Sequence, residues 1–64
     1  MNREQFEKIL NHIINCIEDA GYDAENQITG YALTGDDSYI TRKGNARTRI
    51  HKLDIDQIKD YYEL

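Results

Sequence analysis

The apolar residues of the first twenty positions repeat with the period of an α-helix. They fall at i, i+3, i+4, i+7, i+8 and i+11, and they are Phe6, Ile9, Leu10, Ile13, Ile14 and Ile17. This spacing places one apolar stripe along a helix and leaves a polar face opposite. Asn2 is a candidate N-cap before the stripe, and Gly21 supplies the left-handed residue that ends many helices. We therefore expect a helix over residues 3–20, with an ion pair between Glu4 and Lys8 on its polar face.

Three further helical segments follow the first one along the chain. Asp23 is a candidate N-cap and Gly35 a candidate terminator, so together they predict a second helix over residues 24–34. The apolar spacing then predicts a third helix over residues 46–53. Asp54 is a candidate N-cap for a fourth helix that runs to the end of the chain. The pattern leaves open whether the last two segments are one bent helix.

The length of the chain limits the size of its core. Sixty-four residues leave room for one domain, and we expect residues 1–64 to form a compact all-α domain of three or four helices. A chain this short buries only about 60% of its unfolded surface, and only 39% of its residues are hydrophobic. A small core favours completion by a second subunit, so we expect a homodimer.

The sequence contains no feature of a membrane or secreted protein. No apolar run approaches the roughly 20 residues of a membrane span. The first residues show no apolar segment behind a basic one, as a secretory signal would. The single cysteine excludes an internal disulfide. We expect a soluble, cytoplasmic chain with no membrane insertion.

The charged residues are distributed unevenly, although the formal net charge is only −4. Residues 1–37 carry −6, residues 38–53 carry +5 with no acidic residue, and residues 54–64 carry −3. The basic side chains of the middle segment are candidate interaction residues: Arg42, Lys43, Arg47, Arg49 and Lys52. Such a segment either pairs with acids of its own or a sister subunit, or it meets an anionic partner. We expect ion pairing, within the chain or between subunits.

Binding of nucleic acid through residues 42–52 is the alternative, since the basic side chains there can contact phosphates. Duplex-binding proteins usually present a basic surface, however, and this chain is acidic. The third helix must also bury an apolar stripe. We therefore expect a protein partner and no nucleic acid.

No combination of residues predicts an enzyme, a metal site or a cofactor. His12 and Cys16 are spaced like two ligands on one helix face, but a structural zinc site needs four ligands and His51 is the only other histidine. Asp36 and Asp37 are adjacent, so their carboxylates point in different directions from a turn. We expect a non-enzymatic protein with no catalytic residue, metal or cofactor.

Several residues of the middle of the chain are expected to serve architecture. Asn26 and Gln27 carry amides that can cap or bridge helices. Gly30 lies inside a predicted helix, where glycine costs about 1 kcal/mol relative to alanine, so it more often marks close approach of another backbone than a ligand site. The tyrosines that suit a packed surface with a polar rim are Tyr22, Tyr31 and Tyr39.

An ordered set of residues between positions 21 and 47 forms a composite motif. Its members are Gly21, Tyr22, Asn26, Gln27, Gly30, Tyr31, Gly35, Asp36, Tyr39, Ile40, Ala46 and Arg47. The central run reads N-Q-I-x-G-Y-x-L-x-G-D-x-x-Y-I, and no dipeptide in it is specific by itself. The combined order, in the run from Gly21 to Ile58, resembles the IreB family of small bacterial regulatory phosphoproteins.

The resemblance implies a helical, non-enzymatic homodimer in the bacterial cytoplasm. It implies a regulatory or adaptor role in cell-envelope stress and cell-wall antibiotic tolerance, through protein contacts downstream of a transmembrane Ser/Thr kinase. Members of the family carry phosphoacceptor threonines ahead of the first helix. The first threonine here is Thr29, so the resemblance assigns no phosphoacceptor residue.

Overall fold

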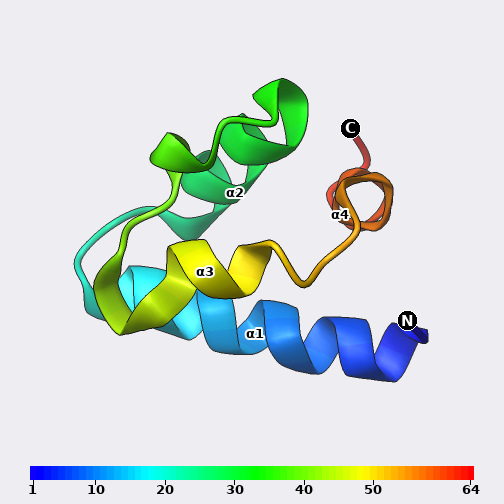
Figure 1. Cartoon of the computed structure of the whole chain (residues 1–64), viewed down its shortest axis with the longest axis horizontal. Helices are drawn as coiled ribbons and strands as arrows, with labels where there is room; N and C mark the ends of the chain where they lie inside the picture. The colour runs from blue at the N-terminus through cyan, green and yellow to red at the C-terminus, as the bar shows by residue number, and fades with distance from the viewer.

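The computed structural model describes all residues from 1 to 64, and every regular element in it is helical (Figure 1). The elements are α1 (Arg3–Asp19), α2 (Ala24–Thr34), the short 3-10 helices η1 (Asp37–Tyr39) and η2 (Lys43–Asn45), α3 (Ala46–Ile50) and α4 (Ile55–Tyr61). The predicted all-α class is therefore confirmed. No helix combines the length and the apolar content that crossing a bilayer requires.

The first helix begins at Arg3 as predicted and ends at Asp19, one residue before the predicted end. The Asn2 side chain accepts a hydrogen bond from the backbone N–H of Gln5 at 2.8 Å. Gly21 follows the helix with a φ of 89°, and the N–H of Tyr22 donates to the carbonyl of Ile17 at 3.1 Å. These contacts satisfy backbone groups that the helix ends leave free.

The ion pair predicted on the polar face of α1 is wrong in its partners. Arg3 and Glu7 form the pair, with 2.6 Å between Nε and Oε2, and no ion pair joins Glu4 to Lys8. Both pairs have the i, i+4 spacing. The spacing alone does not decide which of two overlapping pairs forms.

The second helix also follows its capping residues. The side chain of Asp23 accepts a hydrogen bond from the N–H of Asn26 at 3.2 Å. Gly35 ends the helix in the left-handed conformation, with a φ of 76°, and its N–H donates to the carbonyl of Tyr31. A residue without Cβ adopts this conformation at little cost.

The third helix is shorter than predicted, and it is separate from the fourth. It ends at Ile50, and the next residues form turns in which the N–H of Leu53 donates to the carbonyl of Ile50 at 3.1 Å. Asp54 is extended, with φ −73° and ψ 127°, and its side chain accepts from the N–H of Asp56. Leu53 is buried although it lies in a turn. Its apolar spacing from Ala46 and Ile50 therefore predicted a longer helix than the one that forms.

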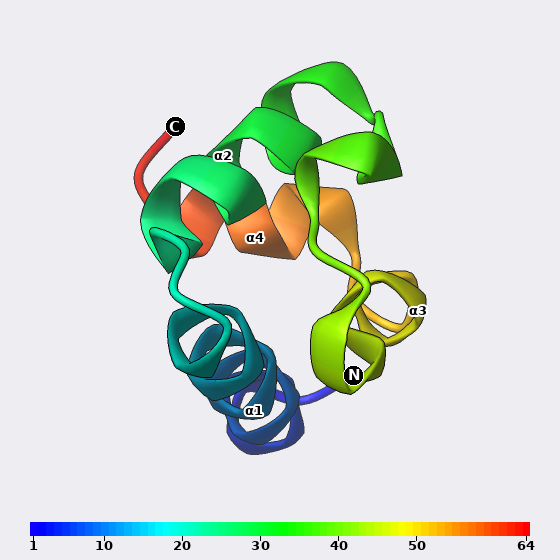
Figure 2. The same ribbon diagram turned by 90° about the vertical axis from the view of Figure 1, so that its left-hand side faces the viewer.

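The helices enclose one core of 13 buried residues, all of them hydrophobic. They are Phe6, Leu10, Ile13, Ile17, Ala24, Ile28, Tyr31, Ala32, Ile40, Ala46, Ile50, Leu53 and Ile58. Helix α3 packs on α1 and α4 packs on α2 (Figures 1 and 2). The rings of Phe6 and Tyr61, with centroids 6.1 Å apart, join the beginning of α1 to α4. Each fully buried large side chain contributes about 1.5–3 kcal/mol.

Candidate anion-binding groove

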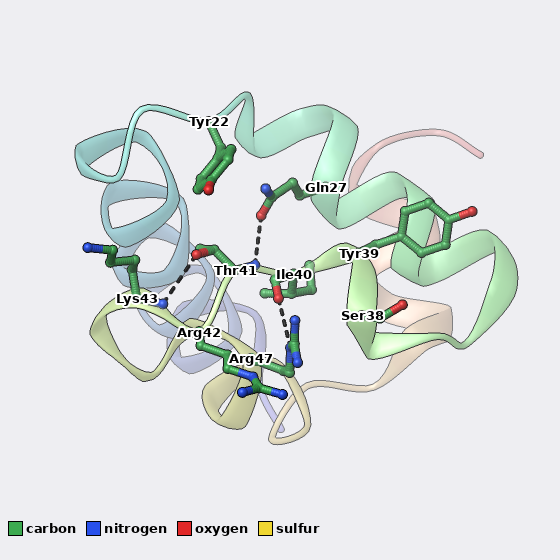
Figure 3. A pocket seen from close by; sticks show the side chains of 9 residues that line it. All are labelled: Tyr22, Gln27, Ser38, Tyr39, Ile40, Thr41, Arg42, Lys43 and Arg47. Carbon is green, nitrogen blue, oxygen red and sulfur yellow. Dashed lines mark hydrogen bonds between the residues drawn. The ribbon is translucent and has the colours of Figure 1, made fainter.

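An open groove lies between the start of α2 and the segment that connects α2 to α3 (Figure 3). Its volume is about 560 Å³. The lining residues are Tyr22, Gln27, Ser38, Tyr39, Ile40, Thr41, Arg42, Lys43 and Arg47. Five of them belong to the composite motif, so residues that are scattered in the sequence converge on one surface.

Gln27 holds the connecting segment against α2. Its Oε1 accepts a hydrogen bond from the backbone N–H of Thr41 at 2.9 Å (Figure 3). The amide therefore bridges two elements, as predicted for Gln27. Asn26 does not share this role, because it is exposed and its side chain forms no hydrogen bond; its backbone N–H donates to Asp23 and its carbonyl accepts from the hydroxyl of Thr29.

Arg47, in α3, is held by two hydrogen bonds to the segment that connects α2 to α3. Its Nε donates to the carbonyl of Ile40 at 2.8 Å (Figure 3), and Ile40 is fully buried. Its backbone N–H donates to the carbonyl of Thr41 at 3.1 Å. The Nε bond orients the guanidinium and leaves its terminal N–H groups available to a ligand.

Three cationic side chains line the groove, and no acidic residue does. They are Arg42, Lys43 and Arg47. The only ion pair within the chain that needs no protonated histidine is Arg3–Glu7. The other close contact, 2.8 Å between Nε2 of His51 and Oδ2 of Asp37, is an ion pair only when His51 is protonated. None of the five basic residues forms an ion pair within the chain, so that part of the expectation is wrong. Ion pairing with a sister subunit stays a prediction.

Asp36 is the acidic residue whose charge interacts with that of Arg47, but its carboxylate already accepts a hydrogen bond from Ser38. Its Oδ1 accepts from the N–H of Ser38 at 3.0 Å, at the start of η1. Hydrogen bonds from the backbone and the hydroxyl of Ser38 lower the pKa of Asp36, and the positive charge of Arg47 lowers it further. An ionised Asp36 thus caps η1 and does not line the groove.

The other two basic residues of the segment lie outside the groove. Lys52 is exposed in the turn after α3. Arg49 is half-buried, and its Nε is buried without a hydrogen-bond partner. The predicted interaction set therefore divides into three residues that line the groove and two that do not.

The hydrophobic and aromatic residues of the motif lie partly in the core and partly on the surface. Tyr31, Ile40 and Ala46 belong to the core, whereas Tyr22 and Tyr39 are 52% and 48% exposed. The three tyrosines expected on one packed surface therefore lie in different environments, because residue spacing cannot show which face of an irregular segment is covered.

Gly30 has a different neighbour from the one expected. A Cβ on Gly30 would lie 2.6 Å from Cδ1 of the Tyr39 ring. The close approach is by an aromatic side chain and not by another backbone. The connecting segment, which the sequence did not place, folds back over α2 and brings the ring there.

A contact that the sequence did not predict joins α1 to η2. The Sγ of Cys16 lies 3.7 Å from the carbonyl oxygen of Gly44, to which the thiol donates. Gly44 has a φ of 59°, and a Cβ there would lie 2.7 Å from Sγ. A glycine in the break before the third helix was the only available signal. No group of three or more potential ligands lies together to hold a metal ion.

The chain thus presents a basic groove on a small all-helical framework, without a constellation of catalytic side chains. Residues 1–62 match the family model described as IreB regulatory phosphoprotein. The chain therefore belongs to the IreB family. This assignment supports a regulatory role, and the family is not a known enzyme family.

Proposed function

We propose that this chain is a non-enzymatic adaptor that acts through protein contacts made at the groove. As the family resemblance implies, it would act in the bacterial cytoplasm, linked to a Ser/Thr kinase pathway that governs cell-envelope stress and cell-wall antibiotic tolerance. One observation carries the proposal: three cations with no ion-pair partner line a groove that no acid lines. Residues 1–64 act as one domain in this proposal.

The groove is suited to binding because hydrogen bonds within the protein hold the residues that line it. Gln27 and the carbonyl of Ile40 fix the connecting segment and Arg47. Fixed side chains lose less conformational freedom when a ligand binds. Arg42 and Lys43 are exposed and form no ion pair, so their charge is available to a partner.

Capture of partners from a native lysate tests the proposal. The bait is the full chain, compared with the double variant Arg42→Glu/Lys43→Glu. The control is Lys8→Glu/Lys52→Glu, which makes the same change in net charge at exposed positions outside the groove. Partners identified by mass spectrometry should be lost only with the first variant. Equal recovery with both variants would exclude the groove as the contact surface.

A homodimer is the second part of the proposal. The single chain closes its own core, so an incomplete core does not support a dimer. The supporting feature is Leu33 on α2, which is 64% exposed and lies on the outer side of the helix. Sedimentation of the chain and of Leu33→Lys at micromolar concentration tests it. A stable monomer in both samples would contradict it.

Binding of nucleic acid is less well supported by the same surface. Helix α3 is only five residues long and buries Ala46 and Ile50, which leaves little of it to enter a DNA groove. Arg49 and Lys52 do not extend the line of charge from the groove. A gel shift with duplex DNA at about 50 mM salt, where phosphate contacts are strongest, tests this function.

A further inference from the structure

We propose that the groove receives a phosphorylated serine or threonine side chain on a segment of a partner polypeptide. This inference rests on the proposed function and specifies the chemistry of the partner. The observation that carries it is that Arg42, Lys43 and Arg47 all line one hollow of about 560 Å³ that no carboxylate lines.

The charge of the groove fits a compact anion. A phosphorylated serine or threonine carries about −1.5 to −2 charges on three acceptor oxygens at neutral pH. Guanidinium groups match this geometry with two parallel hydrogen bonds, and a lysine ammonium adds a point charge. Arg47 is already oriented by the carbonyl of Ile40. Arg42 and Lys43 follow directly after the bonded Thr41, so their Cα positions are held.

The polar lining supplies further donors for phosphate oxygens. The hydroxyl-bearing side chains of Tyr22 and Thr41 line the same hollow as the cations (Figure 3), whereas the hydroxyl of Ser38 is bonded to Asp36. Its volume lies within the roughly 300–1,000 Å³ of sites that enclose a small ligand. It is therefore large enough for one modified side chain and the backbone around it.

The surroundings favour an isolated phosphate over a nucleic-acid strand. A strand presents a phosphate about every 3.4 Å, so it is bound by a track of cations. Here the three cations line one short hollow, and the flanking segments of the sequence carry net charges of −6 and −3. Those segments would repel a continuous polyanion, whereas a single modified side chain needs only the three cations.

The test is a binding titration with fluorescent peptide libraries of degenerate sequence around one central residue. The central residue is phosphothreonine, phosphoserine, threonine or glutamate, and inorganic phosphate and a 20-base-pair duplex serve as competitors. The full chain should bind the phosphorylated libraries at least tenfold more tightly than the unmodified one. Equal binding of the threonine library, or stronger binding of the duplex, would overturn the proposal.

The variant Gln27→Glu tests whether binding depends on the charge of the groove, because it changes that charge while keeping the hydrogen bond that shapes the groove. A glutamate keeps an oxygen acceptor for the N–H of Thr41, but it adds a negative charge to the lining. It should retain the melting temperature and weaken binding of the phosphorylated libraries at least tenfold. The matched control, Asn26→Asp, makes the same charge change next to the groove and should bind normally. Arg42→Glu/Lys43→Glu gives a second loss variant should Gln27→Glu fold poorly.

The failure of this inference is distinguishable from the failure of the proposed function. Lysate partners that depend on Arg42 and Lys43 but survive phosphatase treatment would retain the protein-contact function and overturn the phosphate. Binding of the phosphorylated libraries without any groove-dependent partner in the lysate would support the phosphate site and overturn the proposed protein-contact function. Backbone amide shifts of the labelled chain should map phosphopeptide binding to residues 40–47; shifts confined to other residues would also overturn the inference.

Discussion

Oε1 of Gln27 accepts a hydrogen bond from the backbone N–H of Thr41, which lies 14 positions further along the chain. The bond joins the start of α2 to an irregular segment that has no sheet or helix to satisfy its backbone. On the same segment, the carbonyl of Ile40 accepts from Arg47. Two side chains thus shape the groove by completing the hydrogen bonding of two adjacent residues.

Removal of the Gln27 amide should destabilise the fold. Gln27→Ala leaves the part-buried N–H of Thr41 without its acceptor, and a buried donor without a partner costs about 1–3 kcal/mol. Urea denaturation measures the change in the free energy of unfolding. Asn26→Ala is the control and should change it by less than about 0.5 kcal/mol, as at other exposed positions. Equal effects of the two variants would contradict the role of the bond.

Gly30 and Tyr39 should show coupled effects on stability. Alanine in place of Gly30 gains about 1 kcal/mol of helix propensity, but its Cβ would lie 2.6 Å from the Tyr39 ring. The ring, which is 48% exposed, must move away. Gly30→Ala should therefore stabilise the chain only after Tyr39→Ala has removed the ring. A double-mutant cycle measures this coupling, and additive changes would refute the close contact.

Gly44 should tolerate alanine less well than Gly21 does. Both have positive φ, at 59° and 89°, so alanine at either position is strained by about 1–2 kcal/mol. A Cβ meets nothing within 4 Å at Gly21, but it would lie 2.7 Å from the Cys16 sulfur at Gly44. Gly44→Ala should lower the melting temperature more than Gly21→Ala, and Cys16→Ala should reduce the difference. Identical losses would contradict the packing of η2 on α1.

Tyr62 should make the fold sensitive to alkali. Burial raises its pKa from 10.0 to about 12, with smaller contributions from Tyr61, Glu25 and Glu18. The folded state therefore favours the neutral phenol. The stability that follows is complete below pH 10 and is lost as the pH rises from 10 through about 12.

Melting temperatures between pH 8 and 11.5 measure this dependence, and Tyr62→Phe should flatten it because phenylalanine cannot ionise. The flattening should be partial, since burial also raises the pKa of Tyr31. The variant should melt close to the unaltered chain at pH 7, where both rings are neutral. An unchanged alkaline slope would show that Tyr62 does not carry the effect.

The helices that depend on neighbouring residues were predictable from the sequence. The apolar period and caps of α1 and α2 act over one to four positions, and Asn2, Asp23 and Gly35 perform the roles that their types predict. The end of α3 was not predictable in the same way. Leu53 is buried whether the chain continues as a helix or turns, so its apolar character cannot distinguish the two.

By itself, the sequence determined the all-α class, the capped helices and the family motif, because these depend on local spacing and residue type. Only the tertiary structure decided that Gln27 reaches Thr41, that Tyr39 lies on Gly30, and that three cations share an acid-free groove. The net charge of a segment does not show how far its charged groups lie from those of other segments. Packing of α2 against the connecting segment fixes those distances, and with them the surface that a partner meets.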